Sequence, residues 1–285
     1  MPSVRDLRDR IRSLKNTQQI TKAMKQVAAA KIRRAEIAQR QARPYADALS
    51  EMLRDLIASV GTIDHPFMKP GRDGAPRGLI VMTADKGLAG AFNANLIRTA
   101  VLAQRTDPNL VFYAIGTKAR NALRRLPQQT AYAVPLSAGP KIEAARSVAA
   151  KVTDDFTAGR VSEIVLISAQ FVSMMSQRPQ TRSIVPVVAE RRAATTGPRA
   201  EVEFAPSPED VLTRLLPKYL EFTLYSAMLE TDAAFFAAQL IAMSNATDNA
   251  GKLIDELTLA MNKARQAAIT KEMLEIVGGA EALAG

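Results

Sequence analysis

Cysteine and tryptophan are absent from the 285-residue chain, and histidine occurs once, as His65. Without cysteine the chain has no disulfide, thiolate metal site, cysteine nucleophile or thiol switch. One histidine leaves almost nothing from which to build a histidine-rich metal site or a histidine-centred triad. Aromatic residues make up only 5% of the chain, which disfavours an aromatic-rich β-sandwich or a sugar-binding platform. These absences together disfavour a catalytic role.

Long apolar runs are also missing. The longest nearly apolar stretch, residues 233–243, is interrupted by Gln239 and is too short to cross a bilayer. The N-terminus carries charges throughout and has no apolar segment of the kind found in secretory signals, and Asp6 and Asp9 argue against an organelle presequence. We therefore expect no direct membrane insertion.

Positive charge is concentrated at one end of the sequence. The chain has 38 Lys and Arg against 28 Asp and Glu, a net charge of +10, and residues 1–43 alone hold 12 Lys or Arg against three acids, a net charge of +9. Two interpretations remain open. The first 43 residues form either a solvated helix face or a basic arm that meets nucleic acid, anionic lipid or an acidic protein surface.

Residues 1–59 have the pattern of one long amphipathic helix. Ser3 is placed to cap it, with Asp6 near the positive end of the helix dipole, and we expect a kink at Pro44, where a backbone donor is lost. The apolar positions begin at heptad spacing and then drift, through Val4, Leu7, Ile11, Leu14, Ile20, Met24, Val27, Ile32 and Ala35.

Residues 209–285 form a second helical segment, which we expect to end at Gly278 and Gly279. A strict seven-residue repeat predicts a left-handed supercoil. Because the two helical segments lie at opposite ends of the chain with a compact domain between them, we expect residues 209–285 to form an antiparallel pair with residues 1–59, each burying the seam of the other. At 1.5 Å per residue this helix would be about 100 Å long, roughly twice the width of a compact globule of this mass, so we expect it to project and to be surrounded by a partner. Its seam comprises Leu240, Met243, Thr247, Ala250, Ile254, Leu257, Met261, Ala264 and Ala268.

The middle segment, residues 77–190, alternates apolar strands with helices. This order predicts a mostly parallel sheet flanked by helices, so the expected fold class is α/β: a long two-helix coiled coil plus a central Rossmann-like domain. Strands are predicted at 78–82, 110–115, 131–134, 163–171 and 184–188, and helices at 88–104, 118–126 and 141–156.

Residues 83–90 follow a strand and precede a helix, which is where doubly wound folds bind ligands. The segment lacks GxxxxGK[ST], and its glycines do not match GxGxxG. The alternative is a tight turn with Asp85 capping the following helix. The acidic pairs 154–155 and 255–256 lie on predicted helices and are expected to be solvated, so we expect no metal site, cofactor or catalytic residue.

Four blocks resemble a known family. Residues 16–29 (NTQQITKAMKQVAA), 246–251 (ATDNAG) and 262–279 (NKARQAAITKEMLEIVGG) closely resemble the terminal helices of the gamma subunit of rotary F-type ATP synthases. Residues 83–93 (TADKGLAGAFN) match the signature of that family's middle domain. The resemblance covers essentially the whole chain.

The resemblance implies that the coiled coil is the rotating shaft inside a ring of three alpha and three beta subunits. A membrane c-ring would turn the shaft, and ATP would be made or hydrolysed in the beta subunits. The middle domain would lie near that rotor and contact the epsilon subunit, or delta in mitochondria. The chain would then be peripheral, on the cytoplasmic face of a bacterial inner membrane or the matrix face of the mitochondrial one, with no nucleic-acid partner.

The family pattern also assigns contact residues. It implies that the beta-subunit loops contact Met24, Lys25, Arg265 and Gln266, and that a foot contact with the rotor lies at Phe204. Ala205 stands where the family often has an acid, so this foot lacks the usual charge. The tip of the shaft would sit in an apolar bearing of the head through Ile276, Val277, Ala280 and Leu283.

Two other functions are compatible with parts of the sequence. A basic helical arm could bind nucleic acid, but groove-reading helices pair with a separate dimer zipper, whereas here the cations share a helix with an intramolecular seam. A nucleotide-dependent enzyme would rest only on the fold of the middle segment.

Overall fold

The computed structural model describes residues 3–60, 65–69, 71–137, 139–187 and 207–284. The chain divides into two compact units, Met1–Ala29 with Gln239–Gly285, and Ala30–Ala238. Two long helices, α1 (Val4–Val60) and α5 (Pro208–Ala284), each contribute to both units.

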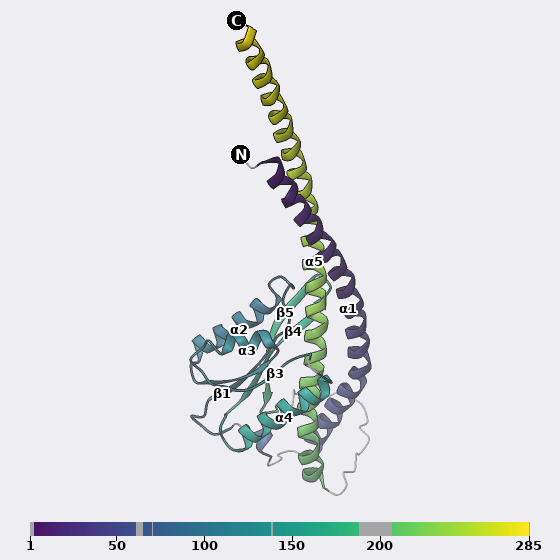
Figure 1. The fold of residues 1–285 in the computed structure, drawn as a ribbon. Coiled ribbons are helices and arrows are strands. Elements are labelled where there is room, and N and C mark those ends of the chain that lie inside the picture. Colours follow the sequence, from purple (N-terminus) through teal and green to yellow (C-terminus); the bar gives the residue numbers. More distant parts are fainter. Residues whose placement is uncertain (1–2, 61–64, 70, 138, 188–206, 285) are drawn as a thin grey trace. The chain divides into compact units, whose positions relative to one another are not determined.

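The first unit is an antiparallel pair of helices (Figure 1). Gln18 Nε2 donates to the carbonyl oxygen of Thr247 at 3.4 Å, and Lys25 Nζ donates to Ser244 Oγ at 3.0 Å. A later residue of α1 thus meets an earlier residue of α5, which fixes the antiparallel direction and confirms the predicted pairing. The buried seam side chains of this unit are Leu7, Ile11, Thr21, Ala28, Met243 and Ala250.

The start of α1 is capped as the sequence predicts. The Asp6 amide donates to Ser3 Oγ at 3.1 Å, and the Ser3 amide donates to Asp6 Oδ2 at 3.1 Å. This reciprocal pair satisfies two backbone donors that a helix start leaves free. The hydrogen bonds from Ser3 lower the pKa of the Asp6 carboxyl.

The α1 seam does not drift, and this part of the prediction is wrong. Ile20 and Val27 are 59% and 55% exposed, whereas Thr21 and Ala28 are buried. The repeat of seven continues unchanged from Leu7, with a threonine and an alanine in core positions. Tertiary pairing therefore overrides local hydrophobicity, because the α5 partner covers whichever residues keep the register.

The helix α5 continues through Gly278 and Gly279 to Ala284, so the predicted stop is also wrong. Glycine in a helix interior costs about 1 kcal/mol relative to alanine, which weakens a helix without ending it. Pro44 and Pro217 likewise lie inside α1 and α5.

The second unit is built on a five-stranded sheet of order β3-β2-β1-β4-β5. Strands β1 to β4 are mutually parallel, and β5 is antiparallel to β4, which confirms the mostly parallel sheet. The strands are β1 (Arg77–Met82), β2 (Leu110–Ile115), β3 (Thr130–Val134), β4 (Ile164–Ser173) and β5 (Ser176–Val185).

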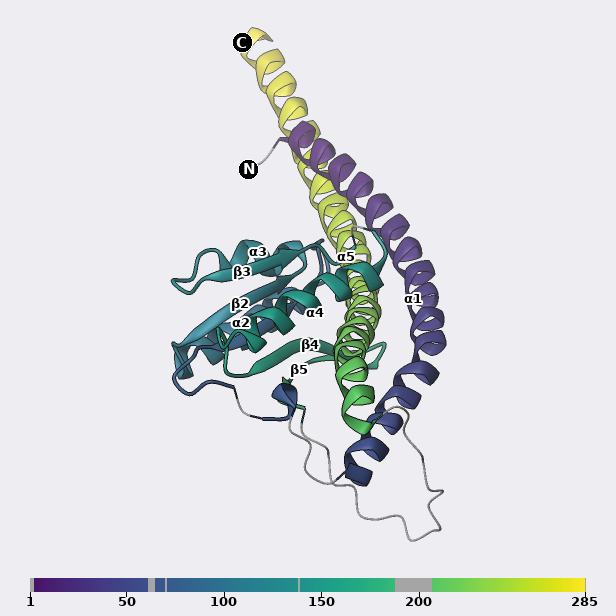
Figure 2. The ribbon, with the colours of Figure 1, turned by 90° about the horizontal axis from the view of Figure 1, so that it is seen from below.

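Helices cover both faces of this sheet (Figure 2). Alternate strand residues point to opposite faces. On one face, Ile80 and Leu166 pack with α4 (Lys141–Thr157) and with the first turns of α5. On the other, Val81 and Ile167 pack with α2 (Phe92–Thr106) and α3 (Thr117–Leu123). A short 3-10 helix, Pro66–Met68, follows His65, whose Nδ1 accepts from the Phe67 amide at 3.2 Å.

Two boundaries in the second unit differ by more than three residues from the predicted ones. Strand β5 begins at Ser176, not at 184, because its first residues are polar and include Pro179, which an edge strand tolerates. Helix α2 begins at Phe92, not at 88, because Leu88 has φ +62° and Gly90 has φ +56°. A left-handed backbone at these two positions holds the preceding segment as a turn.

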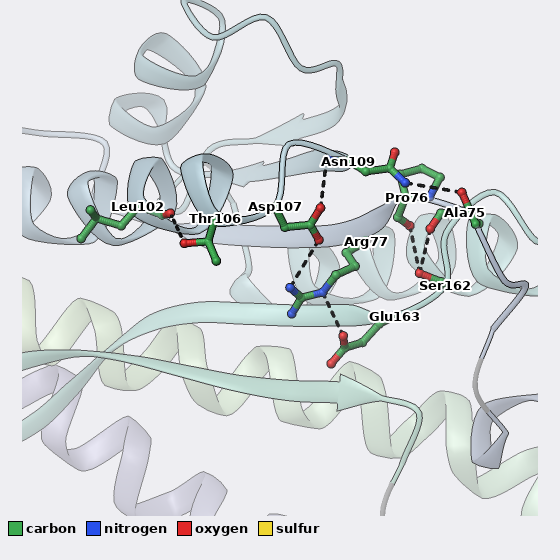
Figure 3. A network of polar contacts seen from close by, with 10 residues as sticks. Ala75, Pro76, Arg77, Leu102, Thr106, Asp107, Asn109, Ser162 and Glu163 are labelled. Atoms are coloured by element: carbon green, nitrogen blue, oxygen red, sulfur yellow. Dashed lines mark hydrogen bonds and ion pairs between the residues drawn. The ribbon is translucent and has the colours of Figure 1, made fainter.

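Polar contacts join the starts of β1 and β4 to the loop before β2 (Figure 3). Arg77 Nε donates to Glu163 Oε2 at 3.0 Å, and its Nη1 lies 3.5 Å from Asp107 Oδ2. Ser162 Oγ donates to the Ala75 carbonyl oxygen at 2.9 Å. These half-exposed groups fix the amino-terminal edge of the sheet.

Asp155 is buried, which corrects the prediction that both acids of the 154–155 pair are solvated. Tyr113 Oη donates to its Oδ2 at 2.7 Å, and Lys151 and Arg160 donate to its Oδ1 at 2.8 and 2.7 Å. Burial opposes ionisation, but hydrogen bonds from Lys151, Tyr113 and Arg160 outweigh it and lower the pKa of this carboxyl. The same burial raises the pKa of Tyr113.

Candidate interaction surface of the coil

A polar layer interrupts the apolar seam of the first unit. The hydroxyl oxygens of Thr21 and Thr247 lie 2.8 Å apart across the two helices. Thr21 also donates to the carbonyl oxygen of Gln18 at 3.0 Å, and Thr247 lies 2.7 Å from that of Met243. Because polar pairs in a coiled-coil core specify register at a cost in stability, this layer sets how the helices align.

A groove of about 520 Å³ opens on the coil beside this layer. Most of its polar groups are amides and ammonium groups, so it offers donors to an acidic or carbonyl-rich partner. None of the described residues that line it carries a carboxylate. The lining residues are Gln18, Gln19, Lys22, Lys25, Gln26, Ala29, Leu240 and Thr247.

The predicted beta-loop contacts fall into two separate places. Met24 is half-buried and Lys25 is exposed, and both lie on one turn of α1 at the groove level. Arg265 and Gln266 are exposed on α5, 21 residues beyond Ser244, which is about 30 Å along a helix. The structure therefore does not bring the four residues into one site.

The end of α5 has no covering helix within the described residues. The seam is at least half-buried as far as Ala264, whereas the side chains from Arg265 to Gly278 are all exposed, Ala268 of the predicted seam included. The backbone at Ala280 and Leu283 is helical, and Phe204 lies outside the described residues. The exposed large apolar side chains of this helical end are Ile269, Met273, Leu274, Ile276 and Val277.

The cations of α1 in the first unit outnumber the acids of the same stretch, Asp6 and Asp9. From Arg5 to Lys25, no lysine or arginine forms an ion pair with another described residue. All seven are exposed. Such a surface attracts an acidic partner over a distance, with a strength that salt reduces.

Sequence reasoning missed the glutamines of the groove. Gln18 occupies a core position of the heptad, and Gln19 and Gln26 flank it on the surface. A polar residue in a core position is the signal that could have indicated this layer, but the apolar residues Ile20, Met24 and Val27 gave a competing pattern.

The turn at residues 83–90 lies at the carboxyl edge of the sheet, where doubly wound folds bind ligands. Asp85 does not cap α2, whose first turn has no side-chain cap. It accepts instead from the amides of Thr117, at the start of α3, and of Ser137, at 2.7 and 2.8 Å. The donors that could hold a phosphate are therefore bound to a carboxylate of the chain.

The described residues contain neither a membrane span nor a metal-ligand cluster. No helix among them is long and apolar enough to cross a membrane. No group of three or more His, Cys, Asp or Glu side chains in these parts of the chain could hold a metal ion.

These features define a class of coiled-coil protein that carries a mixed α/β domain and leaves one helical end uncovered. The ATP synthase family model matches residues 3–283. An ATP synthase gamma chain from Desulforamulus reducens is 45% identical over 284 residues, covering 99% of this chain and 100% of that protein. One from Heliobacterium modesticaldum is 42% identical over 292 residues, with the same coverage. The chain belongs to the ATP synthase gamma chain family.

Solved structures have the same fold. A chain of the Euglena gracilis mitochondrial ATP synthase, solved with OSCP, F1 and c-ring, matches with a TM-score of 0.67 at 17% identity, covering 98% of this chain and 94% of that one. A chain of the central stalk and c-ring structure from Tetrahymena thermophila matches with a TM-score of 0.60 at 21% identity, covering 80% and 99%.

Proposed function

We propose that this chain is the central rotating stalk of an F-type ATP synthase. It transmits torque between a proton-driven c-ring in the membrane and a catalytic head of three alpha and three beta subunits. The observation that carries the proposal is the uncovered end of α5, whose apolar side chains Ile276 and Val277 are 72% and 60% exposed, in a chain of the gamma family. An exposed apolar helix of this kind requires a surrounding partner.

The contact residues follow from this role. Met24 and Lys25 at the groove, and Arg265 and Gln266 further along α5, face the loops of the beta subunits. Ion pairs with acidic loops would be charge-assisted yet solvated, so they would break and re-form as the shaft turns. The remaining assignments are the apolar bearing, made by Ile276, Val277, Ala280 and Leu283, and the foot contact at Phe204.

Catalysis belongs to the beta subunits in this proposal, and the chain has no active site or cofactor of its own. Its α/β domain contacts the epsilon subunit, or delta in mitochondria, and lies near the c-ring. The assembly is peripheral, on the cytoplasmic side of a bacterial inner membrane or the matrix side of the mitochondrial one. The absence of an apolar span in the described residues is compatible with this placement.

Purification from the native host tests the proposal. The chain is tagged, isolated under mild conditions, and assayed for co-purifying subunits and for ATP hydrolysis. We expect alpha and beta subunits together with ATPase activity. A chain that comes alone, or with nucleic acid and without ATPase, would contradict the proposed role and favour the basic-arm alternative.

The predicted beta contact is tested by Arg265→Ala. The expected result is a fall in ATP turnover of the assembled complex that exceeds any loss of assembly, because a charge-assisted contact is removed. Lys263→Ala is the matched control, since both side chains are exposed but point about 160° apart around α5. Equal ATP turnover in the two assembled variants would show that Arg265 does not make the proposed contact with the beta subunit.

A further inference from the structure

Asp85 is enclosed by five hydrogen-bond donors from two loops. Its Oδ1 accepts from the Thr117 amide at 2.7 Å, the Thr117 hydroxyl at 3.0 Å and the Leu136 amide at 3.2 Å. Its Oδ2 accepts from the Ser137 amide at 2.8 Å and from the Ser137 hydroxyl. One carboxylate thus joins the loops that follow β1, β2 and β3.

These donors form the type of site that binds an oxyanion. They are three backbone N–H groups and two hydroxyls, which is the donor set of anion-binding backbone concavities. They lie outside the carboxyl ends of parallel strands, where doubly wound folds bind phosphate-bearing ligands. Hydrogen bonds from Ser137, Thr117 and Leu136 outweigh the opposing effect of burial and lower the pKa of the Asp85 carboxyl.

The surrounding backbone is shaped for this arrangement. Gly116 has φ +96°, and a Cβ there would lie 2.1 Å from the carbonyl oxygen of Thr83, so only glycine lets the two loops approach. Asn93 supports the same turn, because its Oδ1 accepts from the Ala84 amide and its Nδ2 donates to the Lys86 carbonyl oxygen, both at 3.0 Å. The turn holds Leu88 at φ +62°.

We propose that Asp85 is an internal anion, which occupies the donors that a bound phosphate would take in a ligand-binding member of this fold class. It closes the site to free oxyanions and nucleotides, and it locks three loops into one rigid edge. Removing its carboxylate opens a site for a small tetrahedral anion. The inference rests on the second unit alone and does not depend on the proposed function.

Hydrogen exchange of the full-length chain tests this directly. Wild type and Asp85→Ala are compared with Asp154→Ala, which removes an exposed acid and changes the net charge equally. Peptides covering 110–123 and 130–137 report the Thr117, Leu136 and Ser137 amides. We expect exchange there to become about tenfold faster or more in Asp85→Ala only, because a charged acceptor is lost.

Sulfate is the probe for the vacated site. At constant ionic strength, replacing chloride by sulfate should restore slow exchange in the Asp85→Ala peptides in a saturable manner, and leave wild type and Asp154→Ala unchanged. The same titration with inorganic phosphate should behave alike. Unchanged exchange in Asp85→Ala, or an equal sulfate response in all three chains, would overturn the proposal.

A second variant covers the case in which Asp85→Ala does not fold. Asp85→Asn retains the shape but replaces one acceptor oxygen by a donor group, so the Ser137 or Thr117 side of the site loses its partner. We expect faster exchange in that peptide and no recovery with sulfate, because the carboxamide still fills the space. Wild-type exchange in Asp85→Asn would show that the negative charge is not required.

Discussion

Gly116 and Asp155 show how single residues fix the α/β domain. Gly116 is required by two separate constraints, a left-handed φ of +96° and the close approach of Thr83. Asp155 places a charge in the core, where Tyr113, Lys151 and Arg160 compensate it. Each residue therefore supports a prediction that concerns one site.

Replacing Gly116 by alanine should lower the free energy of unfolding by about 3 kcal/mol, since both backbone strain and overlap with Thr83 O must be relieved. Gly74→Ala is the matched control. Gly74 also has positive φ, +78°, but nothing lies within 4 Å of its would-be Cβ, so only the strain of about 1 kcal/mol remains. Urea unfolding measures both variants, and equal losses would mean that the close approach to Thr83 is unimportant.

Asp155→Asn should cost about 2–4 kcal/mol at neutral pH, because Lys151 and Arg160 lose their buried anion. The folded pKa of Asp155 is lowered from its ordinary value of 3.8, so its contribution is complete above the unfolded pKa and is lost as pH falls through the folded one. The stability difference from wild type should therefore be constant above about pH 5 and shrink below pH 4.

Urea unfolding at several pH values measures this difference. Asp154→Asn serves as the control, because Asp154 is exposed, and it should show no comparable loss at neutral pH. A difference for Asp155→Asn that stays the same down to acid pH would contradict the ionised state of Asp155.

At the scale of elements, the coil depends on register more than on local hydrophobicity. The strict repeat places Thr21 and Ala28 in the seam and leaves Ile20 and Val27 exposed. Small and polar core residues bury little apolar surface, so the coil is held mainly by the layers around Leu7, Ile11 and Met243.

Ile11→Ala and Ile20→Ala form a matched pair on α1. Ile11 is 8% exposed, and its replacement should lower the free energy of unfolding by about 2–4 kcal/mol because burial is lost and a cavity is left behind. Ile20 is 59% exposed, and its replacement should lower the free energy of unfolding of the isolated chain by less than about 0.5 kcal/mol. Urea unfolding followed by far-UV circular dichroism distinguishes the two variants. A larger loss of stability for Ile20→Ala would favour the predicted drift of the seam over the strict repeat.

Gly251→Ala should stabilise the coil, by up to about 1 kcal/mol of helix propensity. The added Cβ would lie 3.1 Å from Gln18 Nε2, the end of a flexible side chain whose hydrogen bond to Thr247 is long at 3.4 Å. A small shift of the amide therefore relieves the contact. Gly278→Ala is the control, because nothing lies within 4 Å of a Cβ added there and only the gain in helix propensity remains. A loss of stability in Gly251→Ala would show that the Gln18 side chain cannot move aside.

At the scale of the whole molecule, the chain folds with part of its longest helix uncovered. The side chains from Arg265 to Gly278 are exposed, so they contribute little burial to the isolated chain. In the proposed shaft they contribute to the fit with the head instead. Stability and assembly should therefore depend on different parts of α5.

Truncation tests this separation. A chain ending at Lys271 should keep the wild-type urea midpoint, because no seam residue is removed, yet bind the alpha and beta subunits more weakly in co-purification. A chain ending at Leu253 should be less stable, since the half-buried Ile254, Leu257 and Met261 are lost. A lower urea midpoint for the chain that ends at Lys271 would mean that the end of α5 is part of the folded core.

The sequence by itself determined the two long helices, the alternation that gives a mostly parallel sheet, and the family. It did so because heptad spacing, apolar strands and family blocks are local patterns along the chain. It also gave the Ser3 cap, which depends on residues three apart. The predicted contacts at Met24, Lys25, Arg265 and Gln266 came from the family pattern and stay predictions.

Only the tertiary structure decided which residues face which. The continuation of the α1 seam through Thr21 depends on Thr247, 226 residues away, and the partners of Asp85 lie 32 to 52 residues further along the chain. The sequence predicts Asp155 to be a surface acid, whereas in the fold it is buried and accepts hydrogen bonds from Tyr113 and Arg160. Burial and hydrogen bonding between distant segments are set by packing, and no spacing along the chain encodes them.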